Sequence, residues 1–104
     1  MRSLRTDHTN LTLIDLAIFS VTEFPRMESL SLRHNKLKTL ANSRLSPEWR
    51  SGLVEIDLSH NNLQVVQLVV LTGVLNLTRL DLSFNKIHTL IQVGTYYDHS
   101  ICIF

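Results

Sequence analysis

The chain has almost no cysteine, and this limits how it can be stabilised. Cys102 is the only cysteine among 104 residues, so no disulfide can form within the chain. Small secreted domains commonly depend on several disulfides. We therefore expect an intracellular, cytoplasmic protein that folds without them.

The chain also lacks a dominant charge and a long apolar run. Lys and Arg number 10 against 9 Asp and Glu, both signs are mixed along the chain, and aromatic residues make up only 7%. This composition gives no reason to expect nucleic acid or an acidic membrane surface as a partner. The most apolar run, residues 63–77, contains two glutamines and is shorter than the roughly 20 residues that cross a bilayer. We expect one domain, residues 1–104, with no membrane crossing.

Catalytic signatures are missing as well. The sequence contains no glycine-rich phosphate loop, kinase signature or paired zinc motif. Asp57, Ser59 and His60 together suggest a hydrolase, but alternation along one extended segment turns His60 away from the other two. His34 and His60 have no third His or Cys to complete a metal site. We expect no enzyme, no cofactor, no metal and no small-molecule substrate.

What the chain does have is a pattern of eleven residues that occurs three times. Segments 27–37, 53–63 and 77–87 each read apolar, two variable, apolar, one variable, apolar, two variable, Asn, one variable, apolar. The asparagines of the three segments are Asn35, Asn61 and Asn85. They follow one another at intervals of 26 and 24 residues. Recurrence at such a period is typical of a stacked-repeat protein.

This pattern closely resembles the leucine-rich repeat family, whose repeats are about 20–29 residues long. The interval of 24 residues is most similar to the typical class of that family. The resemblance implies an α/β fold: a right-handed solenoid with short parallel β-strands on its concave face and mostly irregular, 3₁₀ or short helical segments on its convex side. It also implies a non-catalytic module for protein–protein interaction. The cysteine-rich caps of secreted members are missing here, which agrees with an intracellular setting.

The residues themselves favour the same architecture. Leu30 and Leu32, like their equivalents in the other segments, alternate with polar residues and predict a short strand with one buried face. An Asn at the strand end offers two donors and a carbonyl acceptor to the turn that leaves the sheet. We therefore expect the three repeated asparagines to form a structural ladder.

The repeats divide the chain unevenly. We assign residues 27–52, 53–76 and 77–100 as repeats. Residues 11–26 match several apolar positions but place Phe19 where Asn should stand, so we expect a terminal strand or cap, with a degenerate repeat as the alternative. Residues 101–104 either fold back as a tail or begin an aborted fourth repeat, in which Ile101 and Phe104 fill the first two apolar positions. An aborted repeat would indicate a truncated product, such as a fragment or a splice form.

The segments between the strands differ from one another. Residues 46–49 (SPEW) predict one helical turn with the serine as N-cap and the tryptophan packed beneath it. Residues 67–76 are apolar and partly β-branched, which predicts an irregular or 3₁₀ path with Leu71 and Val74 facing inward.

Strand side chains that point away from the core are the candidate binding residues. Equivalent positions of neighbouring strands should form columns with a spacing of about 4.8 Å. The expected columns are Ser29, Glu55 and Arg79; Ser31, Asp57 and Asp81, extended by Asp15 if the N-terminal segment stacks; and Arg33, Ser59 and Ser83. The side chains beside them at the strand ends are His34, His60 and Phe84.

We expect this face to bind a polypeptide partner that carries basic residues. Asp57 and Asp81 should repel each other unless a cation or a partner lies between them. A plainer alternative is that these short polar side chains only keep the sheet soluble. The chain could also be part of a longer signalling protein, a kinase, ligase or scaffold, whose activity lies elsewhere.

A third alternative is an extracellular recognition domain without its caps. Asn10-Leu11-Thr12 and Asn76-Leu77-Thr78 match the glycosylation pattern. Each motif directly precedes an expected strand, where Asn is a common turn residue, so we interpret both as turns.

Overall fold

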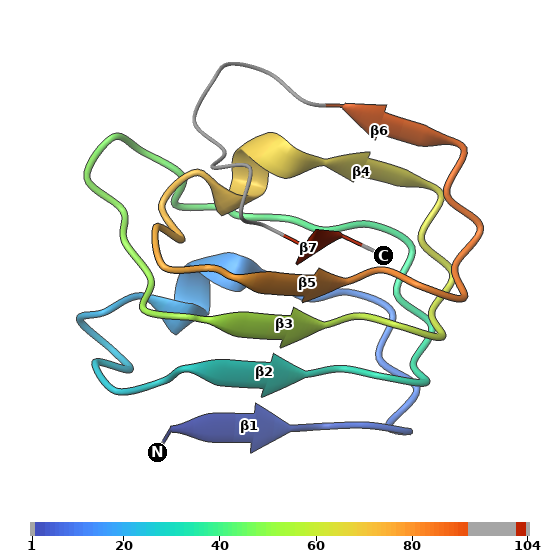
Figure 1. The fold of residues 1–104 in the computed structure, drawn as a ribbon, viewed down its shortest axis with the longest axis horizontal. Coiled ribbons are helices and arrows are strands. Elements are labelled where there is room, and N and C mark those ends of the chain that lie inside the picture. Colours follow the sequence, from blue (N-terminus) through green and yellow to red (C-terminus); the bar gives the residue numbers. More distant parts are fainter. Residues whose placement is uncertain (1, 92–101, 104) are drawn as a thin grey trace.

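The protein is a solenoid in which each turn adds one short strand to a parallel sheet (Figure 1). A computed structural model describes residues 2–91 and the backbone of residues 102–103. The strands of the main sheet, in spatial order, are β1 (Ser3–Arg5), β2 (Ser29–Ser31), β3 (Glu55–Asp57), β5 (Arg79–Asp81) and β7 (Cys102–Ile103). All neighbours in this sheet are parallel, so the predicted solenoid of short parallel strands is confirmed.

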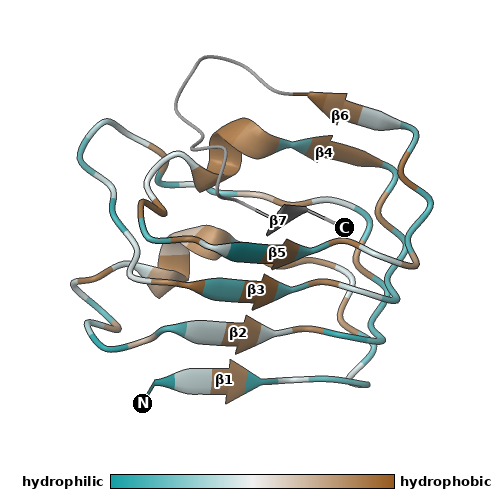
Figure 2. Ribbon diagram, in the orientation of Figure 1, coloured by the Kyte–Doolittle hydropathy of each residue, from teal (hydrophilic) through white to brown (hydrophobic). Residues whose placement is uncertain are grey.

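A second layer lies behind the main sheet (Figure 1). It contains β4 (Val65–Gln67), β6 (Thr89–Ile91) and the 3₁₀ helices η1 (Leu16–Phe19) and η2 (Leu68–Leu71). The predicted 3₁₀ path after residue 67 is confirmed. Figure 2 shows β4, β6 and η2 as mainly hydrophobic, whereas β3 and β5 begin with hydrophilic residues. No helix in residues 2–91 is long and apolar enough to cross a bilayer.

The core is a stack of apolar residues that occupy the same position in successive turns. Leu30, Ile56 and Leu80 stand opposite one another in the sheet, and each is at most 1% exposed. Other core members repeat in the same way: Leu32, Leu58 and Leu82; Leu37 and Leu63. Burial of a Leu or Ile side chain contributes about 1.5–3 kcal/mol. Because the positions align, the leucines of one turn pack on those of the next.

The first strand lies closer to the N-terminus than the sequence pattern suggests. Ser3–Arg5 pairs with β2, and Arg5 stands opposite Ser31. The expectation that Asp15 extends the Asp57 and Asp81 column is therefore wrong, because Arg5 holds that position. Asp15 instead caps η1 by accepting a hydrogen bond from the Ala17 amide, and it bridges to Ala41 in the second layer.

Residues 11–26 form the return path of this first turn and contain η1. Their assignment as a separate cap or a degenerate repeat stays a prediction. At the other end, Ile103 pairs with Leu80, where the pattern predicted Phe104. Residues 92–101 and 104 lie outside the described residues, so the choice between an aborted repeat and a tail also stays a prediction.

Residues 46–49 form a turn and no helix. The Trp49 amide donates to both the backbone oxygen and the Oγ of Ser46, at 3.2 Å each, so the serine caps a single turn. The chain does not continue helically after this turn, and the Arg50 carbonyl accepts a hydrogen bond from the Val21 amide. Trp49 itself is buried, as predicted, and its ring nitrogen donates to the Ala17 carbonyl at 3.3 Å.

Candidate functional site

The sheet register aligns the outward-facing side chains in columns. Glu55 lies between Ser29 and Arg79, and Asp57 lies between Ser31 and Asp81. The third column starts after the strands and contains Arg33, Ser59 and Ser83, of which Ser59 is only 2% exposed. The sheet face is therefore an ordered array of polar side chains. Binding by this array stays a prediction.

The aspartates of the sheet face are already paired within the chain. Arg33 lies 3.4 Å from Asp57, a residue of the next turn, and Arg79 lies 3.3 Å from Asp81 of its own strand. These side-chain pairs offset the expected repulsion between Asp57 and Asp81 without an added cation. Such partly exposed pairs each contribute only about 0–1 kcal/mol.

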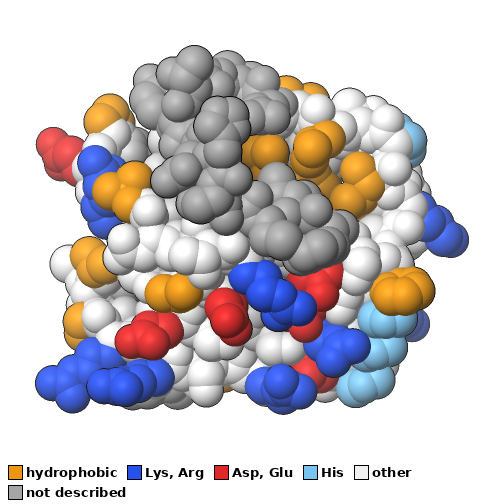
Figure 3. Space-filling model, viewed as in Figure 1, with side chains coloured by type: hydrophobic (Ala, Val, Ile, Leu, Met, Phe, Trp, Pro, Cys, Tyr) orange, Lys and Arg blue, Asp and Glu red, His pale blue; other side chains and the backbone are white. Residues whose placement is uncertain are grey.

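The arginines cover the carboxylates. The Asp57 and Asp81 side chains are 18% and 15% exposed, whereas those of Arg33 and Arg79 are 40% and 47% exposed. The expected acidic column is thus largely hidden, and Figure 3 shows blue side chains prominent among the red ones on this face. The charged groups most exposed to solvent on this part of the face are therefore the guanidinium groups and the carboxylate of Glu55.

The aspartates also hold the strand ends. Asp57 Oδ1 accepts from the Ser59 amide at 3.0 Å and from its hydroxyl at 2.7 Å, and Asp81 does the same with Ser83. Partial burial alone would raise the pKa of Asp81. The hydrogen bonds from Ser83 and the nearby Arg79 and Arg33 outweigh this, so the pKa lies below its ordinary value of 3.8. The carboxylate of Asp81 therefore stays charged at neutral pH, and both aspartates serve a structural role at the strand ends.

The three repeated asparagines connect successive turns. Asn61 Nδ2 donates to the carbonyls of Leu58 and Ser59 in its own turn and of Leu32 in the preceding turn, at 2.9–3.2 Å. Its Oδ1 accepts from the Leu37 amide at 3.1 Å. The remaining members of the ladder, Asn35 and Asn85, make equivalent bonds. The ladder fixes the backbone from which the candidate site projects.

Four rings stack along the edge where the strands end. We call this set the ring column: His8, His34, His60 and Phe84. Neighbouring ring centroids are 4.2–4.4 Å apart, and the rings are within 12° of parallel. Figure 3 shows the pale-blue histidines as a continuous column at one side of the sheet face.

The ring column has an unusual backbone. All four residues have φ between 55° and 58°, the left-handed region that bulky side chains seldom adopt. Each residue immediately precedes the ladder position of its turn, so the ladder bonds hold the backbone in this conformation. The parallel orientation of the rings follows from repeating the same conformation once per turn. The last ring, Phe84, is 73% exposed.

The ring column excludes the catalytic arrangement considered for Asp57, Ser59 and His60. The Ser59 hydroxyl donates to Asp57, while the His60 ring is stacked between His34 and Phe84. Within residues 2–91, no group of three His, Cys, Asp or Glu side chains is placed to hold a metal ion.

The structure adds three polar residues of the first turn that the sequence pattern missed: Arg5, Asp7 and His8. Asp7 accepts from the Ser31 hydroxyl at 2.8 Å and pairs with Arg5 at 3.2 Å. A signal for them exists in the sequence. Segments 1–11 and 27–37 carry the same residue at five of eleven positions when offset by 26, which aligns His8 with His34.

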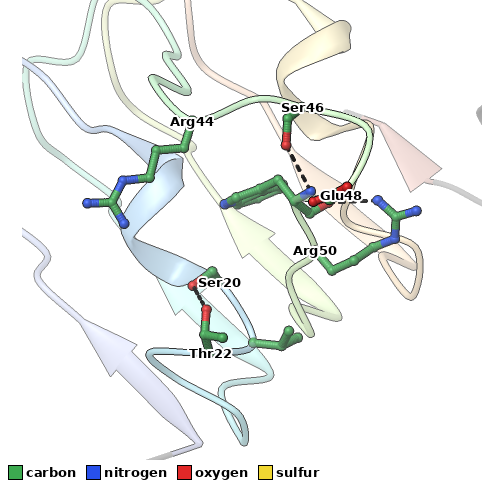
Figure 4. A pocket seen from close by; sticks show the side chains of 8 residues that line it. Ser20, Thr22, Arg44, Ser46, Glu48 and Arg50 are labelled. Atoms are coloured by element: carbon green, nitrogen blue, oxygen red, sulfur yellow. Dashed lines mark hydrogen bonds between the residues drawn. The ribbon is translucent and has the colours of Figure 1, made fainter.

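A separate hollow of about 320 Å³ lies on the return side, beside Trp49. Figure 4 shows that the guanidinium groups of Arg44 and Arg50 point away from each other. Arg44 pairs with Glu23 at 3.0 Å, and Arg50 donates to the carbonyls of Pro47 and Trp49. The hollow therefore lacks convergent donors for an anion.

Comparison with known proteins agrees with this geometry. Residues 51–94 match the family described as leucine rich repeat. No curated protein and no solved structure matches the chain. The matched segment contains β3 to β6 and two members of the asparagine ladder, and the same solenoid turn continues through β2. The family match over residues 51–94 and the parallel-strand solenoid together support a leucine-rich repeat protein.

Proposed function

We propose that the sheet face of this solenoid docks a polypeptide partner. Leucine-rich repeats generally serve as non-catalytic modules for protein interaction, and the candidate face here is the one formed by β2, β3 and β5. The observation that carries the proposal is the array of partly exposed arginines over half-buried carboxylates. Because the ion pairs already fix these arginines, less side-chain entropy is lost when a partner binds.

The partner chemistry follows from which charges are exposed. The guanidinium groups of Arg33 and Arg79 favour carboxylates of the partner. The carboxylate of Glu55, which stands opposite Arg79 in the sheet, favours a basic group of the partner. We therefore propose a polypeptide of mixed charge, which carries carboxylates in addition to the basic residues expected from the sequence. Since the chain has a single cysteine, we also propose that this interaction takes place in a reducing compartment such as the cytoplasm.

A charge reversal on the face tests the proposal. Wild-type protein, Glu55→Arg and the control Glu48→Arg would serve as baits for affinity purification with quantitative mass spectrometry. Both glutamates are exposed, but Glu48 lies beside the return-side hollow. We expect specific partners to be retained by wild type and by Glu48→Arg and to be lost by Glu55→Arg.

Thermal melts of the three proteins would check that the fold is intact. If every co-purifying protein binds Glu55→Arg as well as wild type, the polar residues of the sheet face only keep the sheet soluble.

A further inference from the structure

The charges of the solenoid are segregated. The segments that follow the strands, residues 8–14, 34–40, 60–66 and 84–90, contain no aspartate and no glutamate. They contain three lysines and four histidines. All acidic residues of the chain lie in other segments, although the net charge of the whole protein is only +1.

These four segments stack in register. The amides of Lys36, Asn62 and Lys86 each donate to a carbonyl of the preceding turn. The acceptors are the carbonyls of Leu11, Leu37 and Leu63. Each acceptor directly follows the residue that stacks beneath the donor. Asn10, Lys36, Asn62 and Lys86 thus form one column beside the ring column. A further column contains Thr12, Lys38, Gln64 and His88, of which His88 donates through its amide to the Gln64 carbonyl at 3.0 Å.

We call these two columns, with the ring column, the basic edge. Neighbouring turns are about 4.8 Å apart, so Lys36 and Lys86 stand on the same line about 10 Å apart. Lys36, Lys38, Lys86 and His88 are all exposed. None of the ion pairs in the described residues involves a lysine. Figure 3 shows pale-blue and blue side chains at the right-hand side of the view, beyond the mixed charges of the sheet face.

We propose that the basic edge is a second docking surface and that its partner is an acidic segment of a polypeptide. The choice of partner rests on charge complementarity, because segments that contain no carboxylate of their own attract anions and repel basic partners. The surface is distinct from the sheet face, where every arginine of the array has a carboxylate partner.

The geometry favours a polypeptide over nucleic acid. The rings of the column already stack on one another at 4.2–4.4 Å, which leaves no gap for a base. Three lysines can neutralise about three phosphates, fewer than the roughly 6–10 contacts of strong nucleic-acid binders. A short extended peptide with alternating carboxylates needs only such a small number of contacts.

Binding of a defined probe tests the proposal on the full chain. The probe is a fluorescent twelve-residue peptide of alternating glutamate and serine, and its counterpart has lysine in place of glutamate. We expect the acidic peptide to bind and the basic one not to bind. The double variant K36S/K86S should weaken the acidic peptide about fivefold, the loss typical of two exposed charge contacts.

The double variant R2S/R26S is the matched control. It removes two exposed cations near the start of the strands and changes the net charge equally, so we expect it to retain binding. In NMR titrations of wild type, the peptide should shift the amides of Lys36 and Lys86 more than those of β2 and β3. Equal losses in the two double variants would show a net-charge effect and overturn the proposal.

The proposal would also be overturned by tighter binding of a twelve-nucleotide single-stranded DNA or of phosphatidylserine vesicles than of the acidic peptide. The Glu55→Arg variant keeps the basic edge intact. We therefore expect Glu55→Arg to bind the acidic peptide as wild type does. A failure of the sheet-face proposal can then be distinguished from a failure of the basic-edge proposal.

Discussion

The interior turn built on β3 and the first turn built on β1 occupy equivalent places in the solenoid but close differently. Asn61 satisfies three carbonyls and one amide across two turns. The first turn has Thr9 at the ladder position, and this threonine donates through its amide and hydroxyl to Asn35 Oδ1 at 3.0 Å. The first turn thus depends on the asparagine of its neighbour. A terminal turn can have a side chain with fewer hydrogen-bonding groups at the ladder position, because it connects to one neighbour only.

The inward positions of the two turns differ as well. Leu58 is fully buried in the interior turn, whereas the first turn has Thr6 at the same position. The Thr6 hydroxyl oxygen is buried and has no hydrogen-bond partner among the described residues. Stability should therefore be concentrated in the interior turns and be lower in the first one.

The largest predicted loss of stability comes from adding a methyl group where the interior has no space for it. A Cβ atom added at Gly73 would overlap the Trp49 carbonyl oxygen and ring, so Gly73→Ala should cost more than about 2 kcal/mol of unfolding free energy. Urea denaturation measures this. The control is Gly52→Ala, where the nearest atom is 3.4 Å from the new methyl group and the change should stay within about 1 kcal/mol. Equal stability of the two variants would mean that the Trp49 packing is looser than described.

The next prediction compares the two ladder positions directly. Asn61→Ala leaves the amide of the buried Leu37 without a partner, at about 1–3 kcal/mol, and removes one of the two hydrogen bonds that three carbonyls accept, so we expect a loss of about 2–4 kcal/mol. Thr9→Ala removes a hydroxyl and a methyl group from an exposed side chain and keeps the amide bond to Asn35, so it should cost about 1 kcal/mol or less.

Asn62→Ala serves as the control for the interior turn, because it changes the adjacent asparagine at a partly exposed position. Chemical denaturation of all three variants should rank Asn61 far above Thr9 and Asn62. A first-turn variant as damaging as the interior one would remove the contrast between the turns.

A smaller effect of opposite sign is predicted at the first turn. Thr6→Val replaces the unpartnered buried hydroxyl with a methyl group of similar size and should stabilise the protein by about 1 kcal/mol. Thr12→Val, at an exposed position of the same turn, should change little. Thermal and urea unfolding would measure both variants. Destabilisation by Thr6→Val would show that the hydroxyl has a partner in solution, such as an ordered water.

These contrasts explain which parts of the molecule could be predicted from sequence. The strands β2, β3 and β5 and the ladder follow from leucines and asparagines at fixed positions, because each such residue makes a contact that the repeat requires. β1 was missed because Thr6 and Thr9 replace the two most diagnostic residues of the pattern.

The ion pairs of the sheet face could not be predicted from the sequence. Arg33 reaches Asp57 in a different turn, and the rotamer of a long side chain is set by its neighbours and leaves no periodic signal. Without that pairing, the aspartate column was interpreted as exposed. The stacking in the ring column follows from a left-handed backbone at each ring, which the residue types alone do not indicate.

The smallest predicted effect is a dependence on pH that arises in the ring column. Partial removal of water from the His34 ring, followed by the nearby His60, His8 and Arg33, lowers the pKa of His34 below its ordinary value of 6.5, and Asp7 only partly opposes this. The unfolded chain therefore takes up this proton more readily than the folded chain. The contribution of His34 is complete above pH 6.5 and is lost as the pH falls below that value.

His34→Asn tests this dependence, since asparagine tolerates the left-handed backbone and does not titrate. Unfolding free energies at pH 7.5 and 5.5 should fall more for wild type than for the variant. His88→Asn, which changes a histidine outside the ring column, is the control and should keep the wild-type difference. If His34→Asn loses as much stability as wild type on acidification, the stacked rings do not disfavour protonation, and the pH dependence has another source.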